Sequence, residues 1–325
     1  MSTSALLLIA LASVVLLLLL VIKAKAHPFV ALLIVSLLVA FATGIPADKI
    51  ITTIEKGMGG LLGHIASIII LGSMLGVLIE ISGGAESLAK MLTGVLGSKR
   101  TIAALTIVAF ILGTPVFFEV GFIIIIPLIY GFSKVAHMSP LKFGLPMAGV
   151  MLTVHVALPT HPGAAAAAGI LHSDVGWLML AGIGVSVVVG IVGYFVARSI
   201  NQRHYHLSIN VLEQQQTAEV PDLSVNAQQT RLAPPNALVI GGLIVVPIVL
   251  IVSGTLCQAL LLPENAIRQL MTVIGTPPVA LLISLGLASW TLGIRRGMNL
   301  KKLGEVTGSA IPSSADVILV AGAGG

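Results

Sequence analysis

Long apolar runs constrain the fold of this chain more than any other feature, and the first covers residues 4–22 without a charged side chain. About 20 apolar residues are enough to cross the ~30 Å hydrocarbon core of a bilayer as a helix. Hydrophobic residues make up 57% of the chain and charged residues only 9%, which is more apolar sequence than a soluble core can absorb. The sequence therefore predicts an all-α polytopic membrane protein.

The remaining composition excludes several other classes of protein. The net charge of +5 comes from Lys and Arg residues in short loops between apolar runs, so it indicates membrane topology and no nucleic-acid partner. The single cysteine, Cys257, excludes an internal disulfide or a thiolate metal site. No His-Glu-x-x-His or Gly-x-Ser-x-Gly pattern occurs. We therefore expect no metal, no cofactor and no enzyme.

The apolar runs divide the chain into spans and connections. Further spans are predicted at residues 29–43, 61–79, 177–197, 236–255 and 272–293, and a last apolar segment begins near residue 310. Residues 44–56 are predicted to be a polar loop, and residues 82–98 an amphipathic surface helix with Glu86 and Lys90 one turn apart. Residues 198–235 are hydrophilic and predict a cytoplasmic linker between two halves.

Residues 101–132 are predicted to form a re-entrant hairpin. Its tip, residues 113–121, is broken by Gly113, Pro115 and Gly121 and carries one charge, Glu119. Two full crossings need about 40 residues, so we expect each arm to be too short to span the core. Broken backbone at membrane depth is tolerated only inside protein or beside a watery cavity. Two strongly tilted helices with Glu119 at a wet interface are the alternative.

Residues 143–171 are predicted to form a single crossing by a broken helix. The run is apolar except at Pro159-Thr160-His161-Pro162-Gly163, where two prolines and a glycine in five residues cannot continue a helix. The alternative is a plain exit loop with His161 in water.

The positions of Lys and Arg orient the chain, because these residues are retained in cytoplasmic loops. If the N-terminus is outside, all Lys and Arg residues except Lys49, Lys56 and Arg268 fall on the cytoplasmic side. This assignment requires that residues 101–132 enter and leave the membrane on the cytoplasmic side.

An internal repeat supports the same topology. The segment Pro-Phe-Val-Ala-Leu-Leu-Ile at residues 28–34 recurs as Pro-Pro-Val-Ala-Leu-Leu-Ile at residues 277–283, in the opposite predicted orientation. Two such halves are typical of an inverted-repeat transporter. We therefore expect residues 1–197 to form the first repeat and residues 236–325 to start the second. The counterpart of the hairpin falls beyond residue 325, so the second repeat is expected to be incomplete and substrate binding weak or absent.

The broken segments also carry a family resemblance. Residues 113–122 and 159–163 resemble the gluconate permease family, whose members are proton-coupled importers of sugar acids. The resemblance implies a transporter fold with two re-entrant hairpins, a homodimer and a multi-pass location in the bacterial inner membrane. The chain departs from the family at Thr160 and Ala164, where members usually have proline, and members continue beyond this chain's length.

A sugar-acid site needs backbone N–H groups at helix N-termini for the carboxylate, and hydroxyl or amide groups for the polyol. The substrate-binding candidates in the two broken segments are Gly113, Thr114, Pro115, Thr160, His161 and Gly163. Glu119 and His161 are the candidates for proton coupling. His155 is a rival carrier, and a packed core histidine is the alternative interpretation of it.

The predicted function is import of gluconate or a related sugar acid by proton symport, with the lipid bilayer and protons as partners. Three alternatives stay open: transport of another small organic anion, transport of an amino acid such as serine, or an inactive truncated permease. A channel is disfavoured because the spans offer no continuous polar stripe.

Overall fold

The computed structural model describes residues 1–202 and 234–325, apart from the side chains of Ser98, Glu119, Val120, Ile123, Ile124 and Ser313. Its helices are α1 (Thr3–Leu18), α2 (Pro28–Ala42), α3 (Ala47–Ile81), α4 (Gly84–Leu96), α5 (Thr101–Gly113), α6 (Phe118–Ala136), α7 (Leu141–Ala157), α8 (Pro162–Ile170), α9 (Val175–Ile200), α11 (Ala237–Leu260), α12 (Ala266–Ile274), α13 (Pro277–Ala288), α14 (Leu300–Gly308) and α15 (Ile311–Ala323). Shorter turns are η1 (Leu19–Lys23), η2 (Ser98–Arg100), η3 (Ser289–Gly293) and η4 (Ile294–Arg296). Most of the predicted linker lies outside the described residues.

Six helical segments in the described part of the chain are long and apolar enough to cross a membrane. They are Thr3–Lys23, Ala47–Ile81, Leu141–Ile170, Val175–Ile200, Ala237–Leu260 and Pro277–Arg296. The prediction of an all-α polytopic membrane protein is confirmed.

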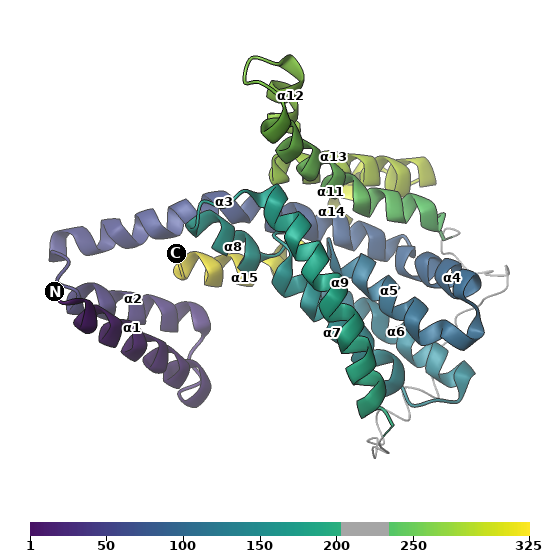
Figure 1. The fold of residues 1–325 in the computed structure, drawn as a ribbon, viewed down its shortest axis with the longest axis horizontal. Coiled ribbons are helices and arrows are strands. Elements are labelled where there is room, and N and C mark those ends of the chain that lie inside the picture. The colour runs from purple at the N-terminus through teal and green to yellow at the C-terminus, as the bar shows by residue number, and fades with distance from the viewer. Residues whose placement is uncertain (203–233) are drawn as a thin grey trace.

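Helix α3, with 35 residues, runs from one end of the molecule into its body (Figure 1). The α1–α2 pair lies at one end of the molecule, beside the N-terminal half of α3, while the C-terminal half of α3 runs into the body. Helix α3 packs against α8, α13, α14 and α15. Ile65, Ile69 and Leu75 of α3 are fully buried, so this half of the helix forms part of the main core.

Three helices build the layer that carries the broken segments. Helix α7 packs between α5 and α9 and also contacts α6. Phe143, Met147 and Met151 of α7 are buried against side chains of the main core, such as Leu105 of α5. This apolar packing fixes the end of α5 relative to the end of α7.

Two of the predicted boundaries are wrong, and in both cases the observed helix starts at or directly after a proline. Residues 44–56 are not a loop, because α3 begins at Ala47 directly after Pro46 and runs for 35 residues. The span predicted at residues 272–293 is present as Pro277–Arg296, and only its start is wrong, since α12 ends at Ile274 and Pro277 starts α13 at its first position. Proline is favoured at the first turn of a helix, where its missing N–H has no partner to lose.

The two arms of the predicted hairpin differ in length. Helix α5 has 13 residues and covers about 20 Å, whereas α6 has 19 residues and covers about 28 Å. The second arm is thus longer than predicted, because it begins at Phe118, inside the predicted tip, and continues past Phe132 to Ala136. The break between the arms is confirmed, and the re-entrant path through a membrane stays a prediction.

The predicted amphipathic helix at residues 82–98 is α4. Its Lys90 Nζ lies 3.1 Å from Glu86 Oε1, as the spacing predicts. Ala85, Leu88 and Ala89 are buried, and α4 packs against α5 and α11, so it is not only a surface helix.

Helices of the two predicted halves pack on each other reciprocally. The repeated sequence places Pro28 and Pro277 at the first positions of α2 and α13. Helix α13 packs on α3, and α15 packs on α2 and α3. Ser314 Oγ of α15 donates a buried hydrogen bond of 2.8 Å to Ser73 Oγ of α3.

Candidate functional site

The candidate site forms where the two broken segments meet. Residues 114–117 separate α5 from α6, and residues 158–161 separate α7 from α8. Thr160 Oγ1 donates a hydrogen bond of 2.8 Å to the Thr114 carbonyl oxygen, and His161 Nε2 lies 2.8 Å from the Gly113 carbonyl oxygen. Four of the six predicted substrate-binding residues are therefore in direct contact.

Two histidines and an aromatic ring surround this contact. The ring centroids of His155 and His161 are 4.7 Å apart. Phe117 lies 6.1 Å from the first ring and 5.9 Å from the second. The backbone N–H of Phe118 donates to His155 Nδ1 at 3.3 Å, which ties the start of α6 to α7.

The surroundings of His161 determine its tautomer. A carbonyl oxygen can only accept, so Nε2 must carry the proton that is donated to Gly113. Nδ1 of the neutral ring then carries a lone pair and can only accept a hydrogen bond, and this atom has no hydrogen-bond partner among the described residues. The residue is 0% exposed. Because buried polar atoms normally have partners, this atom is a candidate acceptor for a substrate hydroxyl or a proton.

Two helix N-termini lie beside the histidine pair. Helix α6 begins at Phe118, which bonds to His155, and α8 begins at Pro162, next to His161. The N-terminal N–H groups of a helix lack intrahelical acceptors and carry partial positive charge. A small anion placed between these two ends would meet both of them.

The other two predicted binding residues lie apart from the hydrogen-bonded contact. Pro115 is buried in the tip, and its carbonyl oxygen would lie 3.5 Å from a Cβ on Gly72 of α3. Gly163 is exposed in the first turn of α8, and no atom lies within 4 Å of the place where its Cβ would be. Its contribution is limited to the backbone of the helix N-terminus.

Close packing against α3 positions the hairpin tip. A Cβ on Gly76 would lie 2.9 Å from Val116 Cγ2, which is closer than side chains normally approach. Gly72 and Gly76 thus let the tip approach the α3 backbone, as expected for small residues between membrane helices. A Cβ on Gly63, one of the other glycines of α3, would meet no atom within 4 Å.

Glu119 lies in the first turn of α6, directly after the residue that bonds to His155. Its side chain lies outside what the structure describes, so the predicted proton-coupling role stays a prediction.

Sequence reasoning missed Glu80, a second acidic residue beside the tip. Glu80 is partly buried near the end of α3 and lines a small cavity of about 10 Å³ together with Val116 and Gly121. Such a volume is at the lower limit for one water molecule. The sequence feature that could have identified Glu80 is its position between two isoleucines at the end of an apolar run, where a carboxylate is unusual.

The described residues contain no group of three or more His, Cys, Asp or Glu side chains that could hold a metal ion. The histidine pair alone offers too few ligands for a structural zinc site. The arrangement is suited to binding an anion and moving a proton.

Comparison with known proteins shows one family over the whole chain. A family model described as GntP family permease matches residues 5–325. The chain is 56% identical over 325 residues to the inner membrane permease YgbN of Escherichia coli, a match that covers 100% of this chain and 72% of that protein. No solved structure matches.

Other similar proteins are named as sugar-acid transporters. The gluconate permease of Zymomonas mobilis is 35% identical over 320 residues, covering 98% of this chain and 69% of that protein. The Gnt-II system L-idonate transporter of Escherichia coli is 30% identical over 319 residues, covering 98% and 70%.

Proposed function

The chain belongs to the GntP family of permeases, and from this premise we propose that it imports gluconate or a related sugar acid together with protons. It is a multi-pass protein of the inner membrane, as the six candidate spans and the similar inner membrane permease indicate together. The family match confirms the expected transporter class. The substrate and the coupling ion are the parts that we propose.

The observation that carries the proposal is that two helix N-termini lie beside a histidine pair, of which His161 is buried and His155 is partly exposed. The start of α6 bonds to His155, and the start of α8 adjoins His161, whose ring lies 4.7 Å from that of His155. A carboxylate bound here would be stabilised by both helix ends without an arginine. Gluconate carries one such carboxylate, and similar proteins are named gluconate permeases.

The polyol would be bound largely by acceptor atoms. Thr160 Oγ1 donates to the Thr114 carbonyl, and Thr114 Oγ1 donates to the Phe110 carbonyl at 3.2 Å. Each hydroxyl proton is thus in use, while the hydroxyl oxygens keep lone pairs. Together with Nδ1 of His161 they would accept hydrogen bonds from sugar hydroxyls.

We propose that Glu119 and His161 take part in proton coupling. Glu119 is placed in the first turn of α6, close in sequence to the Phe118–His155 hydrogen bond. A proton added at Nδ1 of His161 would leave its bond to Gly113 intact, because Nε2 already donates there. Binding of the anion would favour that proton, since opposite charges in a site of low dielectric stabilise each other.

The reciprocal packing of α2, α3, α13 and α15 supports the proposed inverted repeat. In the proposed repeat α2 corresponds to α13, and α3 corresponds to α15. The α3–α13 pair therefore corresponds to the α15–α2 pair, and the helices of each pair are in contact. The division at the linker, the orientation with the N-terminus outside and the homodimer likewise stay proposals.

Uptake into proteoliposomes tests the function. The full chain is reconstituted, and entry of labelled gluconate is measured with and without an inside-alkaline pH gradient. We expect accumulation above equilibrium only with the gradient. Unlabelled L-idonate and serine serve as competitors. Accumulation that ignores the pH gradient would refute proton symport, and competition by serine but not by aldonates would assign an amino acid substrate.

A matched pair of variants tests the site. His161→Gln removes the buried lone pair and the bond to Gly113, while His64→Gln alters an exposed histidine of α3 outside the site. We expect gluconate uptake to fall only in the first variant. Equal uptake by the two variants would show that substrate binding does not depend on the histidine pair.

A further inference from the structure

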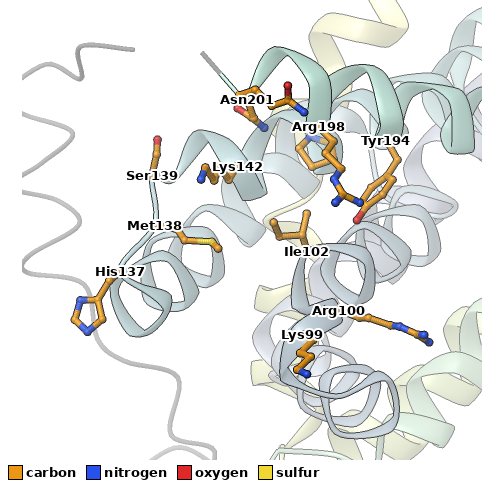
Figure 2. A pocket seen from close by; sticks show the side chains of 12 residues that line it. Lys99, Arg100, Ile102, His137, Met138, Ser139, Lys142, Tyr194, Arg198 and Asn201 are labelled. Atoms are coloured by element: carbon orange, nitrogen blue, oxygen red, sulfur yellow. The ribbon is translucent and has the colours of Figure 1, made fainter. Parts of the chain in front are cut away.

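A second cavity, of about 650 Å³, lies at the far end of α7 from the candidate site (Figure 2). It is bounded by η2 and the start of α5, by the turn between α6 and α7, and by the end of α9. Ile102 contributes an apolar wall, and Tyr194 lies on the α9 side. The charge distribution assigns this end of the helices to the cytoplasmic face.

The charged lining of the cavity is entirely basic. Lys99 and Arg100 come from η2, Lys142 from α7 and Arg198 from α9, and no acidic side chain is among the described lining residues. The ion pairs found in the described part of the chain lie on α4 and α14 and involve none of these four side chains. Four cations around one cavity favour an anionic occupant.

The cavity is separate from the candidate transport site. Lys142 and His155 stand at opposite ends of α7, 13 residues and therefore about 20 Å apart along the helix. Met147, Met151 and Val154, which lie between them, are each 0% exposed; the two methionines belong to the main core, and Val154 belongs to a smaller apolar cluster with Leu158 and Met179. These packed side chains lie between the cavity and the candidate transport site, so we treat the cavity as a binding site of its own.

An exposed apolar stripe leads from the cavity along α9. Arg198 and Tyr194 are one turn apart, and Ile191 and Val187 follow on the same helical face. The side chains of Ile191 and Val187 are 54% and 44% exposed, respectively. A ligand that joins an anionic head to apolar chains would match the basic cavity and this stripe together. Tyr194, at their boundary, is a residue type enriched at membrane interfaces.

We propose that this cavity binds the phosphodiester headgroup of an anionic phospholipid, with its acyl chains along α9. Lys142 and Arg198 hold the phosphate from two helices, α7 and α9, that pack on each other. Arg provides paired donors that fit phosphate geometry, and Lys adds a point charge. The bound lipid would stabilise the cytoplasmic end of the helix layer that carries the transport site.

Native mass spectrometry of the purified full chain tests the proposal. The probe is phosphatidylglycerol, compared with phosphatidylcholine of the same acyl chains. The test variant combines Lys142→Gln with Arg198→Gln, and the control combines Lys23→Gln with Lys25→Gln, two exposed lysines outside the cavity. We expect phosphatidylglycerol to bind about 25-fold more weakly to the test variant than to the control, from the contribution of each basic residue near an anionic surface.

Further arms keep the outcome decisive. Unchanged binding of phosphatidylcholine by the test variant shows that this variant is folded. If the double variant does not fold, the single variant Arg198→Gln takes its place, and it should bind phosphatidylglycerol about fivefold more weakly than the control. Equal affinity of the test and control variants for phosphatidylglycerol would overturn the proposal. Displacement of the lipid by an equal concentration of inorganic phosphate would also overturn it, because the site would then recognise free phosphate.

Discussion

Replacing Gly76 by alanine probes how the hairpin tip is positioned. The new methyl group would lie 2.9 Å from Val116 Cγ2, so either the tip or α3 must move. Overpacking of this kind costs about 1–3 kcal/mol, whereas alanine in place of glycine inside a helix gains about 1 kcal/mol. The net effect of Gly76→Ala is therefore a loss of roughly 0–2 kcal/mol of stability.

Gly63→Ala is the matched control, because Gly63 is in the same helix and no atom lies within 4 Å of the place of its Cβ. It should gain the helix propensity without the clash. The difference in unfolding free energy between the two variants then isolates the overpacking, at about 1–3 kcal/mol. Thermal unfolding of the detergent-solubilised protein, followed by size-exclusion chromatography, ranks the variants.

Transport should respond to the same displacement. Val116 lies in the tip between Gly113 and Phe118, whose backbone groups bond to His161 and His155. A shift of the tip should therefore lower gluconate uptake by about tenfold or more, as misplacing binding groups by about 1 Å does in other sites.

The double variant Gly76→Ala, Val116→Ala removes the clashing methyl groups and should recover both uptake and stability relative to Gly76→Ala. If Gly76→Ala and Gly63→Ala have the same stability and the same uptake, the tip is not held by α3 and the reasoning fails.

Three further predictions follow from the site and the topology. Glu119→Gln should abolish pH-driven accumulation of gluconate while exchange of gluconate across the membrane persists. Unchanged accumulation would assign the proton-coupling role to His161 instead of Glu119. Glu80→Gln should leave gluconate exchange intact and change its pH profile if the carboxylate beside the tip titrates, whereas an identical pH profile would restrict Glu80 to packing. In a cysteine-free background, external labelling of intact cells should reach Asp48→Cys and not Gln215→Cys; the reverse pattern would overturn the orientation and the inverted repeat.

Local features of the sequence were enough to locate both breaks and most of the membrane segments, but the span predicted at residues 29–43 is the 15-residue helix α2, which is shorter than the six candidate spans. An apolar run of sufficient length becomes a spanning helix through its own hydropathy, and Pro162 and Pro115 restrict the backbone beside them wherever the segment lies. For the same reason the salt bridge between Glu86 and Lys90 was predictable, because its partners are one helical turn apart. The family resemblance also rested on these contiguous segments.

The extent of several helices depended on more than hydropathy. The polar residues after Gly44 indicated a loop, yet α3 begins at Ala47, because a helix packed along one face tolerates polar residues on the other. The end of α6 at Ala136 was missed because the apolar run stops at Phe132, whereas the helix continues through Ser133 and Lys134.

The assembly of the site was decided by tertiary structure alone. Thr160 bonds to Thr114, and His161 to Gly113, across 46 and 48 residues of chain, and no local pattern specifies such a pairing. It arises because α7 packs between α5 and α9 and brings the ends of α5 and α7 to the same depth. Glu80 reaches the tip for a related reason, since Gly76 allows Val116 to approach α3. Which residues can break a helix is a property of their own backbone, whereas which breaks meet depends on how all the helices pack.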